Sequence, residues 1–243
     1  SIGVFSHLNL LYLNYNELAG PITGNIAGPV PDGIANLSRL RYLNLSGNNL
    51  TGGIPTWLGT LSELEILNLS VNPNLGGTIP SELASLSNLW MLTLSGTGLT
   101  GTIPSWLGNM SALQQIALTN NQLTGDIPAN LANLSSLWNL NLGNNNLDAG
   151  SLPTWLGGMT ALRHLQLYGN NFTGPLPSEL KNLVNLQILN LNHNQLSGDL
   201  PYWLGDFSAL TKLDLSHNLF TGQLIPELGN LSNLKYLYLH HNQ

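Results

Sequence analysis

A nine-residue pattern of apolar and polar positions recurs along the chain. In Leu186 to Asn194 (LQILNLNHN), apolar leucines stand at the first, fourth and sixth positions, and an asparagine closes the segment. The frame begins at ten positions: Leu8, Leu40, Leu64, Leu89, Leu113, Leu137, Leu162, Leu186, Leu210 and Leu234. The starts are 24 or 25 residues apart, except for a first interval of 32. A fixed period of this length predicts a solenoid in which each copy contributes one short strand.

Each predicted strand is followed by a turn and a second recurrent phrase. In Leu123 to Pro128 (LTGDIP), the glycine permits a positive φ and the proline begins the return path. The next phrase, as in Trp106 to Leu113, is long enough for about one helical or 3₁₀ turn, with Leu107 and Met110 pointing inward. The predicted fold class is an α/β repeat solenoid, with a parallel sheet on the concave side and short turns on the convex side.

The asparagine that closes each frame is predicted to turn inward. Its amide can pair with backbone groups of the loops that would otherwise be buried without partners. The residues are Asn16, Asn48, Asn72, Asn121, Asn145, Asn170, Asn194, Asn218 and Asn242. Thr97 interrupts this series, and its single hydroxyl predicts a local weak point.

The whole chain, residues 1–243, is predicted to be one domain of about ten repeats. It starts and stops partway through a repeat without a polar cap, which favours a segment of a longer protein over end-to-end association. The long first interval holds an eight-residue insertion, Gly20 to Ala27 (GPITGNIA), whose Gly and Pro content predicts a loop.

Charge and composition exclude several partners and sites. The chain has 6 basic and 12 acidic residues, a net charge of -6, which argues against nucleic acid and against an anionic membrane surface. No apolar run approaches the roughly 20 residues of a membrane helix. The chain has no cysteine, which excludes disulfides and thiolate metal sites. No cofactor is predicted.

The chain resembles the plant-type subclass of extracellular leucine-rich repeat proteins. The phrase L-x-G-x-I-P carries the resemblance, for example in Leu99 to Pro104 (LTGTIP), and it covers essentially the whole chain. The resemblance implies a right-handed superhelix with a small second sheet formed by these phrases. The subclass includes receptor-kinase ectodomains, polygalacturonase-inhibitor-like proteins and antifreeze proteins, and similar repeats occur in bacterial and algal surface proteins.

Two departures from the plant receptors favour a microbial or algal surface protein. The cysteine-paired caps that usually flank the array in plant ectodomains are absent. The inner face also shows no Arg-x-Arg pair of the kind that holds a peptide carboxylate in peptide-hormone receptors, since Arg41 and Arg163 stand alone there.

Aromatic residues on the inner strand face provide the candidate partner site. Most solvent-facing strand positions carry short neutral side chains, and no catalytic constellation recurs, so we expect no enzyme activity. Trp90 and Trp138 share a column about 10 Å apart. Trp, Tyr and Arg are enriched at binding hot spots. The predicted partner-binding residues are Trp90, Trp138, Arg163, His164, Gln166 and Tyr168. Simple covering of the sheet by large side chains is the alternative.

Three further series of residues recur along the repeats. Trp57, Trp106, Trp155 and Trp203 recur in every second repeat, which favours rings packed on the convex surface over a lateral contact surface. His193, His217 and His241 form one column with His240 beside the last; solvated histidines are favoured, and no metal site is predicted. Eight N-x-S/T sequons arise mostly from the repeat phrases and give weak evidence of glycosylation.

The sequence favours an extracellular or cell-surface scaffold that binds a protein, peptide or glycan on its concave face. An ice-binding protein is the alternative, because Thr51, Thr100, Thr124, Thr173 and Thr221 form a neutral ladder, although Gly76, Asp148 and Ser197 interrupt it. A structural surface or filament subunit, self-associating end to end or laterally, is a third hypothesis.

Overall fold

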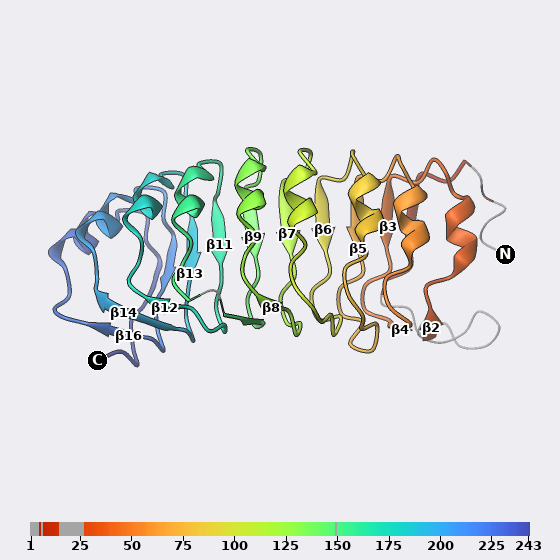
Figure 1. The fold of residues 1–243 in the computed structure, drawn as a ribbon. Helices are drawn as coiled ribbons and strands as arrows, with labels where there is room; N and C mark the ends of the chain where they lie inside the picture. Colours follow the sequence, from red (N-terminus) through yellow and green to blue (C-terminus); the bar gives the residue numbers. More distant parts are fainter. Residues whose placement is uncertain (1–4, 6, 15–26, 149) are drawn as a thin grey trace.

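The computed structural model describes residues 5, 7–14, 27–148 and 150–243. The repeats stack side by side, so the first strand, β1, and the last, β17, lie at opposite ends of the described stack (Figure 1). Within the described residues, no helix is both long and apolar enough to span a membrane.

One parallel sheet of ten strands runs the length of the stack, with strand order β1-β3-β5-β6-β7-β9-β11-β13-β15-β17. Register places equivalent residues of successive repeats opposite each other, for example Leu43 opposite Leu67. The strands are β1 Leu10–Tyr12, β3 Tyr42–Asn44, β5 Ile66–Asn68, β6 Met91–Thr93, β7 Gln115–Ala117, β9 Asn139–Asn141, β11 His164–Gln166, β13 Ile188–Asn190, β15 Lys212–Asp214 and β17 Tyr236–Tyr238. The predicted repeat solenoid is confirmed.

Short 3₁₀ turns, rather than α-helices, form a row along one side of the repeats (Figure 1). A proline sits immediately before most of these turns, where its fixed φ suits the extended N-cap, as at Pro104. Leu107 and Met110 are buried, as predicted. The turns are η2 Asp32–Asn36, η3 Thr56–Thr60, η4 Ser81–Ser85, η5 Ser105–Asn109, η6 Ala129–Asn133, η7 Thr154–Gly158, η8 Ser178–Asn182, η9 Tyr202–Asp206 and η10 Pro226–Asn230.

The second sheet implied by the family resemblance is divided into three short pieces among the described residues. β2 Ala27–Pro29 pairs with β4 Asn49–Thr51, and β8 Thr124–Gly125 pairs with β10 Asn146–Leu147. β12 Thr173–Gly174, β14 Gln195–Asp199 and β16 Leu219–Thr221 form the third piece. Ala27, the last residue of the predicted insertion, begins β2; residues 20–26 lie outside the described residues.

The closing asparagines bind successive repeats together, as predicted for those that are described. Asn145 is typical: its Nδ2 donates to the Leu142 carbonyl at 3.0 Å and to the Leu118 carbonyl of the preceding repeat at 2.9 Å. Its Oδ1 accepts the N–H of Leu123 at 3.1 Å. Each such amide therefore pairs buried backbone groups of two repeats at once. Asn16 lies outside the described residues.

Thr97 keeps part of this bonding. Its hydroxyl donates to the Leu94 carbonyl at 2.7 Å and lies 3.0 Å from Asn121 Oδ1. In other repeats, the closing asparagine accepts an N–H from the preceding repeat. The corresponding N–H beside Thr97 is that of Leu75, and it donates instead to the Asn72 carbonyl at 2.9 Å. The longer turn of that repeat therefore compensates for one missing bond, and the weak point at Thr97 stays a prediction.

In the described repeats, the residue before each closing asparagine, and before Thr97, adopts a left-handed backbone conformation. Glycine fills this position at Gly47, Gly96 and Gly169, and asparagine fills it at Asn120 and Asn144. Val71 occupies it with φ 58°, although a β-branched residue is strongly disfavoured there. Val71 is also 51% exposed, so little burial offsets the strain.

We expect Asn121→Ala to lower the free energy of unfolding by about 3–5 kcal/mol. The change removes the side-chain acceptor of the Thr97 and Leu99 N–H groups and one of the two side-chain donors to the Leu94 carbonyl, all in the buried interior. Urea denaturation measures the difference. Asn130→Ala, at an exposed asparagine of η6, is the control and should leave stability nearly unchanged. Equal effects of the two substitutions would contradict the bridging role.

We expect Val71→Asn to raise the free energy of unfolding by about 1 kcal/mol, because a left-handed conformation costs an ordinary residue roughly 1–2 kcal/mol. Asparagine already occupies this position in two other repeats. Val184→Asn is the matched control, since Val184 is 56% exposed and has an ordinary φ. A gain for both variants would point to removal of exposed apolar surface rather than relief of strain.

Candidate functional site

The solvent-facing side chains of the ten-stranded sheet, called here the sheet face, form columns along the stack. Main-chain hydrogen bonds fix the column that begins each strand segment: the N–H of Gln114 donates to the Trp90 carbonyl, Trp138 donates to Gln114, and Arg163 donates to Trp138, at 2.9, 3.0 and 2.9 Å. Trp90 and Trp138 therefore share a column, as predicted, with Gln114 between them. Both indoles are half-buried.

Trp138 and His164 are in direct contact. Their ring centroids are 5.5 Å apart at an interplanar angle of 79°, an edge-to-face arrangement. Burial lowers the pKa of His164, and the neighbouring Arg163 lowers it further, whereas a hydrogen bond with Gln187 raises it. The imidazole is thus favoured in its neutral form, which can both donate and accept a hydrogen bond beside the indole.

Tyr168 lies across the backbone of the preceding repeat. Gly143 stands directly beneath its ring, and a Cβ added at Gly143 would overlap the ring atoms. Burial raises the pKa of the Tyr168 phenol, so the hydroxyl stays protonated and available as a donor. In the sequence, Gly143 belongs to a column of mostly short, neutral strand residues. A glycine at this position, next to a tyrosine at the equivalent position of the following repeat, is the sequence feature that indicates this close packing.

The six predicted partner-binding residues are only partly brought together. Trp138 and His164 touch, Gln166 ends the same strand as His164, and Tyr168 follows two residues later. Arg163 is exposed beside His164. Trp90 is two repeats away from Trp138, with Gln114 of the intervening repeat between them. The name aromatic patch is used below for Trp138, His164, Gln166 and Tyr168.

Several other polar groups of the sheet face are engaged by their own backbone. Asn68 Oδ1 accepts the N–H of Ser70 at 3.0 Å, and Asn44 Oδ1 accepts both the N–H and the hydroxyl of Ser46, at 3.0 and 2.7 Å. These side chains shape the strand ends. The repeated N-x-S spacing, which also creates sequons, was the sequence signal for this local role.

Charged pairs lie toward the two ends of the sheet face. Arg41 forms an ion pair with Glu65, and its Nε donates to the carboxylate at 2.7 Å. Lys212 Nζ lies 3.7 Å from Asp214 and 5.5 Å from the centre of the Tyr238 ring. The middle of the face, around the aromatic patch, is consequently dominated by uncharged groups and the single cation Arg163.

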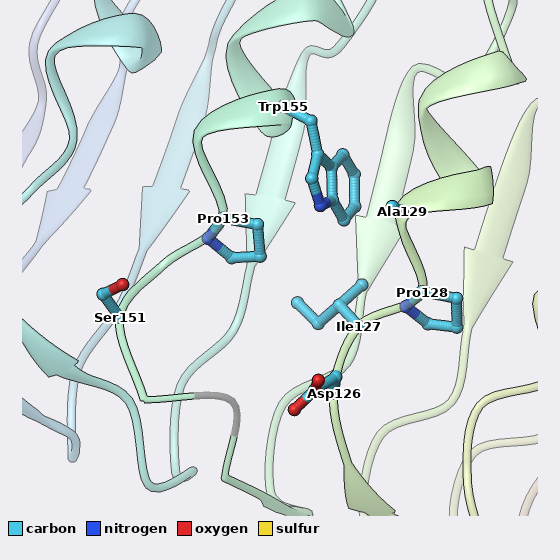
Figure 2. A pocket seen from close by; sticks show the side chains of 7 residues that line it. All are labelled: Asp126, Ile127, Pro128, Ala129, Ser151, Pro153 and Trp155. Carbon is cyan, nitrogen blue, oxygen red and sulfur yellow. The ribbon is translucent and has the colours of Figure 1, made fainter.

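The second tryptophan series packs against the core, as the sequence favoured. Trp203 is buried against Phe207, with ring centroids 5.9 Å apart, while Trp57, Trp106 and Trp155 are partly buried. Trp155 also borders an open cavity of about 380 Å³ between two repeats, together with Asp126, Ile127 and Pro128 (Figure 2). This hollow lies by the turns and loops, away from the strands of the sheet face (Figure 2).

A family model described as a leucine-rich repeat region matches residues 5–243. The chain belongs to the leucine-rich repeat family. A comparison of this leucine-rich repeat chain with curated proteins finds no match.

Solved structures of plant proteins share the fold. The ectodomain of the receptor kinase GASSHO1/SCHENGEN3 from Arabidopsis thaliana, in complex with CASPARIAN STRIP INTEGRITY FACTOR 2, is 39% identical over 89% of this chain, with a TM-score of 0.86. The Arabidopsis receptor kinase HAESA, in complex with the peptide hormone IDA and the co-receptor SERK1, is 33% identical over 96%, with a TM-score of 0.79. The leucine-rich repeat chain covers 26% and 41% of these structures.

A plant ice-binding protein is also similar. It is 30% identical to the leucine-rich repeat chain, with a TM-score of 0.78; the match covers 92% of this chain and 68% of that protein. These relatives include ligand-binding receptors and an ice-binding protein, so the shared fold is compatible with both of the leading hypotheses.

We expect Gly143→Ala to displace the Tyr168 ring and to lower its phenol pKa toward the ordinary value, because the ring loses the burial that raises it. A pH titration of ¹³C-tyrosine NMR signals, with Tyr168→Phe to assign the resonance, measures the change. Gly158→Ala is the control, since a Cβ there meets nothing within 4 Å. An unchanged Tyr168 pKa in Gly143→Ala would show that the ring does not depend on this close approach.

Proposed function

We propose that this leucine-rich repeat domain is a non-catalytic binding scaffold that recognises an extracellular protein or peptide on its sheet face. The observation that carries the proposal is the aromatic patch. Two adjacent repeats place Trp138 against His164 and lay Tyr168 over Gly143, which leaves an uncharged, rigid surface with hydrogen-bonding edges. Such aromatic groups dominate the binding energy of many interfaces.

The relatives support this class of ligand. HAESA and GASSHO1/SCHENGEN3 are plant receptor kinases; the HAESA structure is a complex with a peptide hormone, and the GASSHO1/SCHENGEN3 structure is a complex with CASPARIAN STRIP INTEGRITY FACTOR 2. We further propose that the chain belongs to the plant-type L-x-G-x-I-P subclass, on the strength of phrases such as Leu99 to Pro104. A glycan is the alternative ligand, since aromatic rings with adjacent amides also suit sugars.

The proposed ligand contacts are the six residues predicted from the sequence, with unequal roles. Trp138, His164 and Tyr168 form the centre, and Gln166 lies among them. Arg163 supplies a positive charge at the margin for an acidic group of the ligand, and Trp90 extends the surface toward the N-terminal repeats. A ligand that reaches both indoles must span about 10 Å, roughly three residues of extended peptide.

A selection from a displayed random-peptide library tests the site. We expect Trp138→Ala to weaken the selected peptides by about 30-fold or more, the effect of losing a hot spot worth 2 kcal/mol. Tyr202→Ala is the control, because Tyr202 is 67% exposed and lies in η9, away from the sheet face.

Thermal melts of both variants show whether the loss reflects unfolding. Peptides that bind Trp138→Ala and Tyr168→Ala as tightly as the unaltered chain would place recognition elsewhere. Failure to select any peptide, together with binding on a glycan array, would favour the glycan alternative.

Ice binding is a second candidate because of the similarity to the plant ice-binding protein. In this chain Thr100, Thr124 and Thr173 are exposed, and Thr102 is bridged to Thr124 in the adjacent repeat. However, the residue of the following repeat that pairs with Thr124 is Asn146, so the row of threonines is interrupted there. Thermal hysteresis and ice recrystallisation inhibition by the purified chain decide this point; activity that Thr124→Leu abolishes would assign ice binding to that row.

A further inference from the structure

Four histidines gather at one edge of the last repeats. His193, His217 and His241 occupy the position before the closing asparagine in successive repeats, and their rings stack with centroids 4.1 and 4.2 Å apart. His240 approaches from the side: its ring lies 5.3 Å from that of His217 at an interplanar angle of 82°. The histidines therefore form a cluster rather than a simple row.

The backbone does not require histidine at these positions. His193, His217 and His241 have φ of 52°, 53° and 56°, the left-handed conformation that glycine or asparagine supplies in most other repeats. Main-chain hydrogen bonds hold the histidines in register, with the His217 N–H donating to the His240 carbonyl at 3.0 Å. The backbone therefore holds the three imidazole rings at fixed positions. A smaller residue could adopt the same backbone conformation at each of these positions.

Three of the rings bring nitrogen atoms close together. One ring nitrogen each from His217, His240 and His241 lies within 4.8 Å of the others. Nitrogens about 2.0–2.1 Å from a tetrahedral zinc ion stand roughly 3.3 Å apart. Movements on the order of 1 Å close that difference, and His240 and His241 are exposed and can make them by side-chain rotation. Because His240 comes from the side, the three donors form a triangle.

The metal-binding atoms available in this cluster are imidazole nitrogens. The nearby carboxylate of Asp214 is already engaged: Oδ1 accepts the Ser216 hydroxyl at 2.7 Å, and Oδ2 accepts Asn192 Nδ2 at 2.8 Å. Its negative charge still lies close to the cluster. Imidazole donors suit zinc, copper, nickel and iron, whereas calcium and magnesium require oxygen donors.

We propose that His217, His240 and His241 bind one first-row transition-metal dication of the zinc class through three imidazole nitrogens, with the remaining coordination positions open to water. His193 stacks on the outer face of the His217 ring and is not among the three ligands. The site lies in the last repeats, separate from the aromatic patch, so its test is independent of the proposed peptide or protein ligand.

Isothermal titration calorimetry of the 243-residue chain, without a polyhistidine tag, tests the site with Zn²⁺ alone. We expect one Zn²⁺ per chain and no binding of Ca²⁺ under the same conditions. We expect His217→Asn to weaken Zn²⁺ binding by at least roughly 10–100-fold, the range seen even for residues that only support metal ligands. Asparagine suits the left-handed backbone, and melting in EDTA confirms that the variant is folded.

His193→Asn is the matched control, because it makes the same substitution at the same position of the preceding repeat. It should retain Zn²⁺ binding within a few-fold of the unaltered chain. Absence of Zn²⁺ binding overturns the proposal, as does a His217→Asn variant that binds as before. Equal losses in the two variants would also overturn it, since they indicate scattered surface histidines rather than a three-ligand site.

Discussion

The bridging of consecutive repeats by a buried asparagine amide is the interaction on which the rest of the structure depends. A solenoid must turn its chain sharply after every strand, and each turn leaves main-chain groups facing the interior. The amide of Asn145 meets both demands, because it donates to carbonyls of two repeats and accepts an N–H of the preceding one. The leucine core supplies most of the burial, main-chain hydrogen bonds set the strand register, and the amides join each turn to the repeat before it.

The same turn explains the unusual backbone position that precedes each asparagine. The chain adopts a left-handed conformation there, and the amide of the next residue then faces inward. The residue types found at this position differ in how well they tolerate that conformation. Glycine meets it without strain, asparagine and histidine meet it tolerably, and Val71 does not. Three histidines in successive repeats then become neighbours through the register alone, and His240 joins them from the side.

The two proposed sites differ in chemistry but share one regular frame. The aromatic patch depends on a pairing across repeats, Tyr168 over Gly143 and Trp138 against His164, and offers surface for a macromolecular ligand. The histidine cluster depends on stacking within one column and offers nitrogen donors for an ion. In both, a rigid sheet brings residues some 24 residues apart in sequence into contact, so neither site needs a long functional loop.

Leucine spacing and the closing asparagines were sufficient to predict the repeat solenoid, the inward Leu107 and Met110, and the shared column of Trp90 and Trp138. They also predicted a short turn in each repeat, although not whether it is helical or 3₁₀. These features follow from a period that each repeat obeys locally. The tertiary structure alone decided what depends on side-chain rotamers and on neighbours in the next repeat. It placed the Trp138 ring edge-on to His164, revealed that Gly143 makes room for Tyr168, and turned His240 toward His217 and His241. It also showed that the turn from Asn72 to Leu75 satisfies an N–H for which Thr97 offers no amide. A periodic sequence specifies which residues are neighbours, but packing specifies how their side chains meet.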